Sequence, residues 1–434
     1  MDTNGLLLWL RENDPEAKSN LKFSSKLQVQ YFESSGYGLY YNSSTQFSPR
    51  ELLISLPKSL LINYLSCSKH ILSYKGSQDC FLFNSLDYNS IKLPGSLEND
   101  EFSRNIYSKL EASDLYALSS FQLVTFYLVI ESQRKSSFWS PFLQVLPKLP
   151  TFYGIPLTWE ICNLEFSIDG DNLDKINNHK DIDDCGVLSD IENSNLLMKN
   201  PLISLLPFSM QIHVKKQYYK FKNDYQTIIS LIKKRCTLSQ TEIQDIIPME
   251  KFLWSWLCIN SRCLYMELPS KFDNKTIDDN FTLCPLVDFI NHCDDSHSNS
   301  SSIKIDKSSF SVFTSGENPN YRTSNEEIQE LYFSYGAHSN AFLFAEYGFI
   351  LSDSNKWETV DISENISEML DDEKTKYLES IGYFNDYSIN HESISFRTTV
   401  ALSLISNSDA KDPFRKINFL INGTIDETEF EKKK

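Results

Sequence analysis

Three polar side chains stand close together in an otherwise apolar stretch of the sequence. Asp288, Asn291 and His292 follow Pro285 and are flanked by leucine, valine, phenylalanine and isoleucine. The spacing i, i+3, i+4 predicts that they share one face of a helical turn. Such groups need hydrogen-bond partners. Internal hydrogen bonds would supply them, and so would a ligand with an ammonium group and several donors. From these residues alone, the structural turn is the simpler interpretation.

A second group of polar and aromatic residues follows further along the chain. Ser334-Tyr335-Gly336, Ser339-Asn340 and Tyr347-Gly348-Phe349 occur in a stretch rich in apolar residues. A tyrosine such as Tyr347 in this setting usually belongs to the core, with its hydroxyl bound to a backbone carbonyl. A role for Tyr347 in chemistry is therefore a hypothesis that depends on the first group as well.

A glycine pair near the N-terminus offers a third candidate. Gly36-Tyr37-Gly38-Leu39 lacks the third glycine and the following helix of the dinucleotide fingerprint. The sequence from Lys26 to Tyr41 predicts a strand, a tight turn at the glycines and a second strand. A hairpin turn explains the glycines, and so does close approach of the backbone to a nucleoside or amino-acid group.

Metal chemistry finds little support. His292, Cys293, Asp294, Asp295 and His297 could all bind a metal, but the run ends in a serine- and asparagine-rich tract and no second cluster completes a shell. The nine cysteines have irregular spacings without a zinc-knuckle pair. We predict no metal site, and free thiols in a reducing compartment.

Apolar periodicity indicates the elements that position these groups. Helices are expected at 5–12, 114–133, 203–236, 249–264, 364–381 and 396–405, and strands at 52–57, followed by a helical start at Lys58, and at 310–314. The proline-punctuated segment 138–150 cannot be one helix. Residues 163–200 are polar and acidic, which is typical of a mobile insertion.

Composition limits the class of protein. At 434 residues the chain should form two or three packed units. A net charge of −17 argues against binding nucleic acid through its phosphates and suits a basic partner, although it serves solubility equally well. No apolar run is long enough for a signal peptide or a membrane span. We therefore expect a cytoplasmic protein, with the nucleus as an alternative.

The order of these groups resembles that of the SET-domain lysine methyltransferases, in the branch that includes plant Rubisco large-subunit methyltransferase and the fungal ribosomal-protein and elongation-factor methyltransferases. The resemblance covers most of the chain. The matching segments are 36–39, 139–149, 158–160, 252–265, 285–292 and 334–349.

The resemblance implies an α+β fold, in which a knotted, β-rich SET core is split by an inserted helical domain and followed by a short helical C-terminal domain that docks the protein substrate. We place the N-terminal half of the core at 1–100 and the helical insertion at 101–260, with an acidic flexible loop at 163–200. The C-terminal half of the core, with the active site, is placed at 261–355 and the docking region at 356–434.

The resemblance also assigns roles to residues. The cofactor is S-adenosylmethionine. Its binding residues would be Gly36, Tyr37, Gly38 and Leu39 through their backbone, Ser261, Arg262 and Asp288 at its amino-acid or sugar part, Asn291 and His292 at its amino group and adenine, and Tyr347. Tyr347 would also be the catalytic tyrosine. Tyr335 and Phe349 are candidates for the walls of the substrate channel, although ordinary packing explains them equally.

The expected activity is methylation of a protein lysine. A free lysine has a pKa of about 10.4, so an apolar, aromatic channel must favour the neutral amine before it can attack a methyl group. The substrate is expected to be a basic ribosomal protein or elongation factor, the enzyme a monomer, and neither nucleic acid nor membrane a direct partner. No cysteine follows Cys293 to form the zinc element of histone-type enzymes. A catalytically silent binding module and a histidine methyltransferase are the alternatives.

Overall fold

The computed structural model describes residues 3–13, 21–32, 36–75, 93, 100–166, 176–177, 199–268, 281–293, 301–305, 309–315, 327–351, 355–390, 392–406 and 413–422. The described chain forms two units, one comprising residues 1–336 and 342–350 and the other comprising 337–341 and 351–434. Each has its own apolar core. Most of the acidic segment 163–200, and Asp294, Asp295 and His297, lie outside the described residues.

The first unit combines small sheets with a group of helices. Its strands are β1 (Lys22–Phe23), β2 (Gln28–Phe32), β3 (Gly36–Asn42), β4 (Leu52–Pro57), β5 (Ile62–Asn63), β6 (Glu165–Phe166), β7 (Ile176–Asn177), β8 (Leu264–Tyr265), β9 (Phe281–Leu283), β10 (Asn291–His292), β11 (Ser301–Ile305), β12 (Ser309–Thr314) and β13 (Ile328–Phe333). Its helices are α1 (Thr3–Glu12), α2 (Tyr64–Ser73), α4 (Glu101–Tyr107), α5 (Ala112–Ala117), α6 (Ser120–Gln133), α7 (Ser140–Leu143), α8 (Pro156–Ile161), α10 (Phe208–Arg235), α11 (Gln240–Ile246), α12 (Met249–Arg262) and α13 (Asn340–Tyr347), whose first two residues belong to the second unit.

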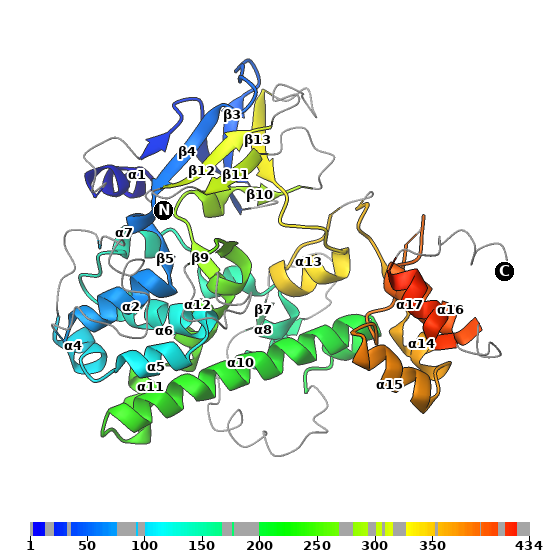
Figure 1. Cartoon of the computed structure of the whole chain (residues 1–434). Helices are drawn as coiled ribbons and strands as arrows, with labels where there is room; N and C mark the ends of the chain where they lie inside the picture. The colour runs from blue at the N-terminus through cyan, green and yellow to red at the C-terminus, as the bar shows by residue number, and fades with distance from the viewer. Residues whose placement is uncertain are drawn as a thin grey trace. The chain divides into compact units, whose positions relative to one another are not determined.

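Three sheets each join strands from early in the sequence to strands from much later in it. The strand orders are β1-β4-β12-β11, β10-β13-β3-β2 and β5-β9-β8. In Figure 1 the blue strands β3 and β4 accordingly lie beside the yellow-green strands β13 and β12. This pairing brings β3 and β4 next to segments that lie more than 250 residues later in the sequence.

The helices between these strands share the same apolar core. The core cluster runs from Leu6 in α1 through Phe126 in α6 and Trp256 in α12 to Leu331 in β13. Helix α6 begins at a capping box in which the Ser119 hydroxyl accepts a hydrogen bond from the Gln122 N–H. The helices and strands of the first unit therefore pack around one apolar core.

The second unit is a small helical group with a two-stranded sheet. It contains β14 (Val360–Asp361), α14 (Ser363–Glu368), α15 (Asp372–Ser380), β15 (Ser388–Ile389), α16 (Phe396–Ser406) and α17 (Pro413–Ile421). Its core includes Leu378, Tyr387, Val400 and Ile417, which are fully buried. No helix in the described ranges of either unit has both the length and the apolar character that crossing a membrane requires.

Several expected elements are confirmed. Helices at 5–12, 249–264 and 396–405, and strands at 52–57 and 310–314, correspond to α1, α12, α16, β4 and β12, and the helix expected at 203–236 begins only at Phe208.

Three expectations were wrong. The helix expected at 114–133 is two helices, because Leu118 is extended and Ser119 caps α6. The helix at 364–381 is likewise divided into α14 and α15, since Asp371 caps the second. The glycines expected in a tight turn, Gly36 and Gly38, belong to strand β3, where they pair with Phe32 and Gln30.

Candidate active site

Strand pairing joins the two polar groups of the sequence. Strand β10 pairs in parallel with β13, with Asn291 opposite Tyr332 and His292 opposite Phe333. Strand β13 also pairs antiparallel with β3, which contains the glycine segment. Three segments that are far apart in the sequence therefore meet in one sheet.

The expected helical turn across Asp288, Asn291 and His292 was wrong. A single 3₁₀ turn ends at Phe289, and Asn291 and His292 then form strand β10. Adjacent residues of a strand point to opposite faces, so these two side chains cannot share a face. The backbone pairs with β13 instead of continuing as helix, because that strand offers hydrogen bonds to Asn291 and the residues after it.

Asn291 connects the sheet to the glycine segment. Its Nδ2 donates to Glu330 Oε1 at 2.6 Å and to the Tyr37 carbonyl at 3.4 Å. The other Glu330 oxygen accepts from the Tyr332 hydroxyl at 2.8 Å. Burial raises the pKa of Glu330, against the lowering effect of those two hydrogen bonds. Asn291 thereby fixes the backbone at Tyr37, whose ring lies 6.1 Å from that of Phe289.

His292 orients the second group. Its Nδ1 accepts a hydrogen bond from the Tyr335 N–H at 3.0 Å, so the neutral ring carries its proton on Nε2. The ring centroid lies 5.0 Å from that of Tyr335 and 6.0 Å from that of Phe349. The buried His292 ring thus fixes the position of the backbone at Tyr335.

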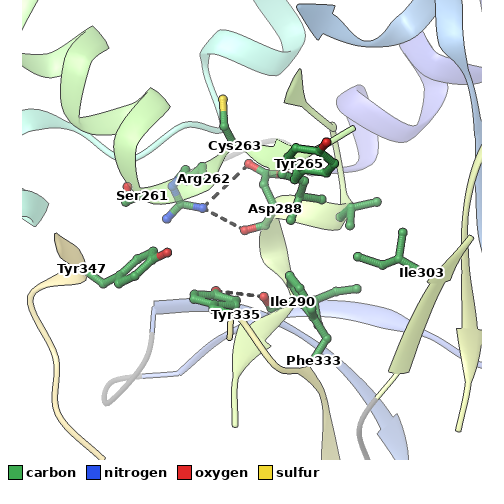
Figure 2. A pocket seen from close by; sticks show the side chains of 12 residues that line it. Ser261, Arg262, Cys263, Tyr265, Asp288, Ile290, Ile303, Phe333, Tyr335 and Tyr347 are labelled. Atoms are coloured by element: carbon green, nitrogen blue, oxygen red, sulfur yellow. Dashed lines mark hydrogen bonds and ion pairs between the residues drawn. The ribbon is translucent and has the colours of Figure 1, made fainter. Parts of the chain in front are cut away.

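A cavity of about 280 Å³ lies beside strands β10 and β13 (Figure 2). It is bounded by the end of α12 and strand β8, by the turn before β10, by β11 and β13, and by two tyrosines. The lining residues are Ser261, Arg262, Cys263, Leu264, Tyr265, Val287, Asp288, Ile290, Ile303, Phe333, Tyr335 and Tyr347.

One side of the cavity is aromatic. The rings of Tyr335 and Tyr347 are 5.2 Å apart, and Phe333 lies 5.1 Å from Tyr335. The Tyr335 hydroxyl donates to the Ile290 carbonyl at 3.0 Å, whereas the Tyr347 hydroxyl points into the cavity (Figure 2). Burial raises the pKa of both phenols, that of Tyr347 to about 12 with a further contribution from the Glu346 charge. Both hydroxyls are therefore protonated at neutral pH.

The opposite side carries an arginine and a carboxyl group. Arg262 Nη1 donates to the Asp288 carbonyl at 2.9 Å and lies 3.7 Å from Asp288 Oδ2. Within the described part of the chain, neither Asp288 carboxyl oxygen nor Arg262 Nε has a hydrogen-bond partner. Burial raises the pKa of Asp288 to about 6, although Arg262 and, more weakly, the nearby backbone N–H groups of Asp288 and Leu286 oppose that shift. These unsatisfied groups give the cavity its capacity to bind a polar ligand.

The predicted site residues fall into two neighbouring groups. Ser261, Arg262, Asp288, Tyr335 and Tyr347 line the cavity together. The others lie outside its lining: His292 and Phe349 pack on the two tyrosines, Asn291 bonds to Tyr37, and Gly36, Gly38 and Leu39 continue strand β3.

Sequence reasoning missed several lining residues. Val287 and Ile290 were interpreted only as the apolar background of the polar group, and Ile303 follows a serine- and asparagine-rich tract of sequence with no recognisable pattern. Cys263, Leu264 and Tyr265 directly follow the predicted Arg262, and Phe333 is two residues before Tyr335. Adjacency to predicted residues was the signal that could have identified these four.

Among the residues with described positions, no cluster of three or more histidine, cysteine, aspartate or glutamate side chains could hold a metal ion. The seven cysteines that the described ranges contain are all free.

The chain is similar to known proteins over nearly its full length. It is 28% identical over 474 residues to "Ribosomal lysine N-methyltransferase 2" of Saccharomyces cerevisiae, covering 99% of this chain and 86% of that protein. It is also 28% identical over 243 residues to "Ribosomal lysine N-methyltransferase set11" of Schizosaccharomyces pombe, covering 53% of this chain and 55% of that one. Residues 358–434 match the family described as "Ribosomal lysine N-methyltransferase 2 C-terminal domain".

The fold is similar to a solved structure. The SET domain of LSMT, crystallised with lysine and AdoHcy, superimposes with a TM-score of 0.54 at 16% identity, covering 96% of this chain and 76% of that one. The mixed α+β fold class is thereby confirmed, and the sequence matches confirm the family resemblance.

Proposed function

We propose that this chain, a SET-domain protein-lysine N-methyltransferase that depends on S-adenosylmethionine, methylates a lysine of a ribosomal protein. The observation that carries the proposal is the cavity itself, where two tyrosines face a buried carboxyl and arginine at the junction of β10 and β13. The relatives named for ribosomal substrates support the substrate class.

The residues present fit the cofactor. Both buried Asp288 oxygens and Arg262 Nε lack partners in the described chain, and a ligand with ammonium, hydroxyl and carboxylate groups would satisfy them. We assign Ser261, Arg262 and Asp288 to its amino-acid or sugar part, with Asn291, His292 and the Gly36–Leu39 backbone as the neighbouring contacts. When bound, the cofactor supplies an electron-poor methyl group on a sulfonium.

The cavity also suits a lysine side chain. The aromatic side chains of Phe333, Tyr335 and Tyr347 line the cavity and would shield a bound amine from water. Desolvation between these rings would lower the pKa of the lysine amine and favour its neutral form. Catalysis then rests mainly on holding the neutral amine in line, which proximity and orientation alone can make effective.

Two tyrosines share the catalytic role in this proposal. Because the Tyr335 hydroxyl donates its hydrogen bond to the Ile290 carbonyl, its oxygen lone pairs would be free to accept weak CH hydrogen bonds from a bound methyl donor. The Tyr347 hydroxyl points into the cavity (Figure 2), where it could interact with a bound amine. Tyr347, predicted as the catalytic tyrosine, therefore remains a candidate together with Tyr335, and Phe349 supports its ring from 6.0 Å.

The larger architecture adds further proposals. We assign the second unit, whose residues 358–434 match the C-terminal family, to docking of the basic substrate protein, helped by the net charge of −17. The knotted core, the helical insertion at 101–260 and the remaining segment limits stay proposals, as do the monomeric state and the cytoplasmic location.

Methyl transfer from labelled S-adenosylmethionine to purified ribosomal proteins tests the function. We expect label on one protein, and a loss of about a hundredfold or more in rate for Tyr335→Phe or Tyr347→Phe. Tyr219→Phe, an exposed tyrosine on α10, is the matched control.

Three outcomes would overturn parts of the proposal. Unchanged rates in both tyrosine variants would reject the assigned site. Calorimetry without detectable cofactor binding would favour a silent binding module, and mass spectrometry that places the methyl group on histidine would favour a histidine methyltransferase.

A further inference from the structure

The residue before Tyr347 is held by two other helices. Glu346 Oε1 lies 2.5 Å from His213 Nε2 on α10, and Glu346 Oε2 accepts from Asn260 Nδ2 on α12 at 2.6 Å. Gln217 on α10 donates to the Ala345 carbonyl at 3.3 Å. The C-terminal turn of α13 is thereby attached to both helices. We call Glu346, His213 and Asn260 the carboxylate clamp.

The carboxylate clamp connects two walls of the cavity. Asn260 directly precedes Ser261 and Arg262, which line one side, and Glu346 directly precedes Tyr347, which lines another. Asn260 Nδ2 also approaches the Glu346 carbonyl at 3.5 Å. The hydrogen bond between Asn260 and Glu346 therefore links the backbone next to Arg262 directly to the backbone next to Tyr347.

The chain after Tyr347 is constrained as well. Gly348 has φ +80°, and a Cβ there would lie 3.1 Å from Ile155 Cγ1 and 3.2 Å from the Gly154 carbonyl carbon. Both the conformation and the space require glycine. Tyr347 thus lies between Glu346, which the carboxylate clamp holds, and Gly348, which packs closely against Gly154 and Ile155. Neither Glu346 nor Gly348 can shift freely.

The hydrogen bonds of the clamp are strong ones. Burial by itself would raise the pKa of Glu346, but the hydrogen bonds from His213 and Asn260 outweigh it and the pKa is lowered. Glu346 is therefore ionised at neutral pH, and its hydrogen bonds are charge-assisted, which makes them shorter and stronger than neutral ones.

We propose that Glu346 is a positioning residue, which sets the place of the Tyr347 hydroxyl in the methyl-transfer cavity through His213 and Asn260. The inference rests on the proposed function. A displacement of about 1 Å in a catalytic group can cost roughly a hundredfold in rate. Loss of the clamp should therefore lower kcat while the affinities for cofactor and substrate stay nearly constant.

A double-mutant cycle between Glu346→Ala and Tyr347→Phe tests this. We expect Glu346→Ala to reduce kcat by roughly ten- to hundredfold, with KM for the ribosomal protein and calorimetric affinity for S-adenosylmethionine changed by less than about threefold. Combined with Tyr347→Phe, it should cause little further loss, because it acts through that hydroxyl. Glu346→Gln should restore part of the rate, and Glu250→Ala, an exposed glutamate on α12, should have none of these effects.

The outcomes separate the inference from the proposed function. Full multiplication of the two rate losses would show that Glu346 acts on the rate independently of Tyr347, and a lowered melting temperature with unchanged kcat would show that it acts only on stability. Either result would overturn the positioning role. An inert Tyr347→Phe in an enzyme that still methylates ribosomal protein would overturn the positioning role and leave the proposed function intact. A wild-type protein that transfers no methyl group to any ribosomal protein would reject the proposed function itself.

Discussion

Two buried carboxyl groups in this chain each lie close to an arginine, but their surroundings differ. Glu131 on α6 accepts hydrogen bonds from Arg134 Nη1 at 2.9 Å to each oxygen, from the Ser137 hydroxyl at 2.5 Å and from the Tyr107 hydroxyl at 3.0 Å. Asp288, in contrast, is 3.7 Å from its arginine and has no hydrogen bond to its carboxyl oxygens within the described residues.

The difference separates a structural network from a binding site. Burying a charge is costly unless it is paired and hydrogen-bonded, and the network around Glu131 meets that condition without lining the cavity. Asp288 faces the cavity and does not meet it, so its burial costs free energy that a bound ligand can recover. An incomplete polar pair beside a cavity is therefore better evidence of function than a complete pair.

The largest change in stability is expected from Glu131→Gln, which tests whether the Glu131 network is structural. Because the side chains of Glu131 and Arg134 are both fully buried, the variant leaves a buried guanidinium without its main counter-charge. We expect the free energy of unfolding to fall by about 3–5 kcal/mol in urea titrations. Glu250→Gln, on an exposed glutamate, should change it by less than about 0.5 kcal/mol. A loss for Glu131→Gln as small as that of the control would mean that the network is not structural.

The matching change at the site is Asp288→Asn, and its effect on stability should have the opposite sign. The pKa of Asp288 is raised to about 6 by burial, so replacing the carboxylate should increase the free energy of unfolding by about 1–3 kcal/mol at pH 7.5. Cofactor affinity, measured by calorimetry, should fall at least tenfold. A destabilised variant that binds the cofactor normally would remove the distinction between the two carboxyl groups.

A smaller effect is expected from Ser137→Ala. It removes one neutral donor to Glu131, but the two Arg134 contacts and the Tyr107 contact remain. We expect a loss of about 1–2 kcal/mol in the free energy of unfolding and no change in cofactor affinity. Ser132→Ala is the matched control, because the Ser132 hydroxyl, on α6, donates to the Val129 carbonyl at 2.9 Å and not to a charged group. Equal losses in the two variants would indicate that the hydrogen bond from Ser137 to Glu131 stabilises the fold no more than the bond from Ser132 to a backbone carbonyl.

Only part of this comparison between Glu131 and Asp288 could be predicted from the sequence. The polar group at 288–292 and the aromatic group at 334–349 were identifiable, because their residue types contrast with apolar neighbours. Apolar periodicity likewise located helices α10, α12 and α16. What it could not show was which distant strand would pair with Asn291 and His292, so a helical face was expected where the chain forms a strand.

Hydrogen-bond partners far apart in the sequence were also beyond prediction. His213 and Glu346 are 133 residues apart, and neither is unusual in its own helix. The network of Glu131 was overlooked for the same reason, since a glutamate near the end of an apolar helix looks like an exposed residue. Charged residues are assigned to solvent by default, and only coordinates reveal that a carboxylate is buried and whether it is satisfied.

The pH dependence of stability offers the most delicate test of the comparison. The pKa of Asp288 is about 6 in the folded protein and near its ordinary value of 3.8 when unfolded, so between these values the folded state holds a proton that the unfolded state has lost. The contribution of protonated Asp288 to the free energy of unfolding is therefore present at low pH and is lost as the pH rises through about 6. Between pH 5.5 and 7.5 wild type should lose about 1 kcal/mol relative to Asp288→Asn. Because other groups titrate equally in both proteins, the difference between their urea unfolding curves isolates Asp288. A difference that stayed constant with pH would mean that the Asp288 carboxyl is already satisfied in the free protein, like that of Glu131.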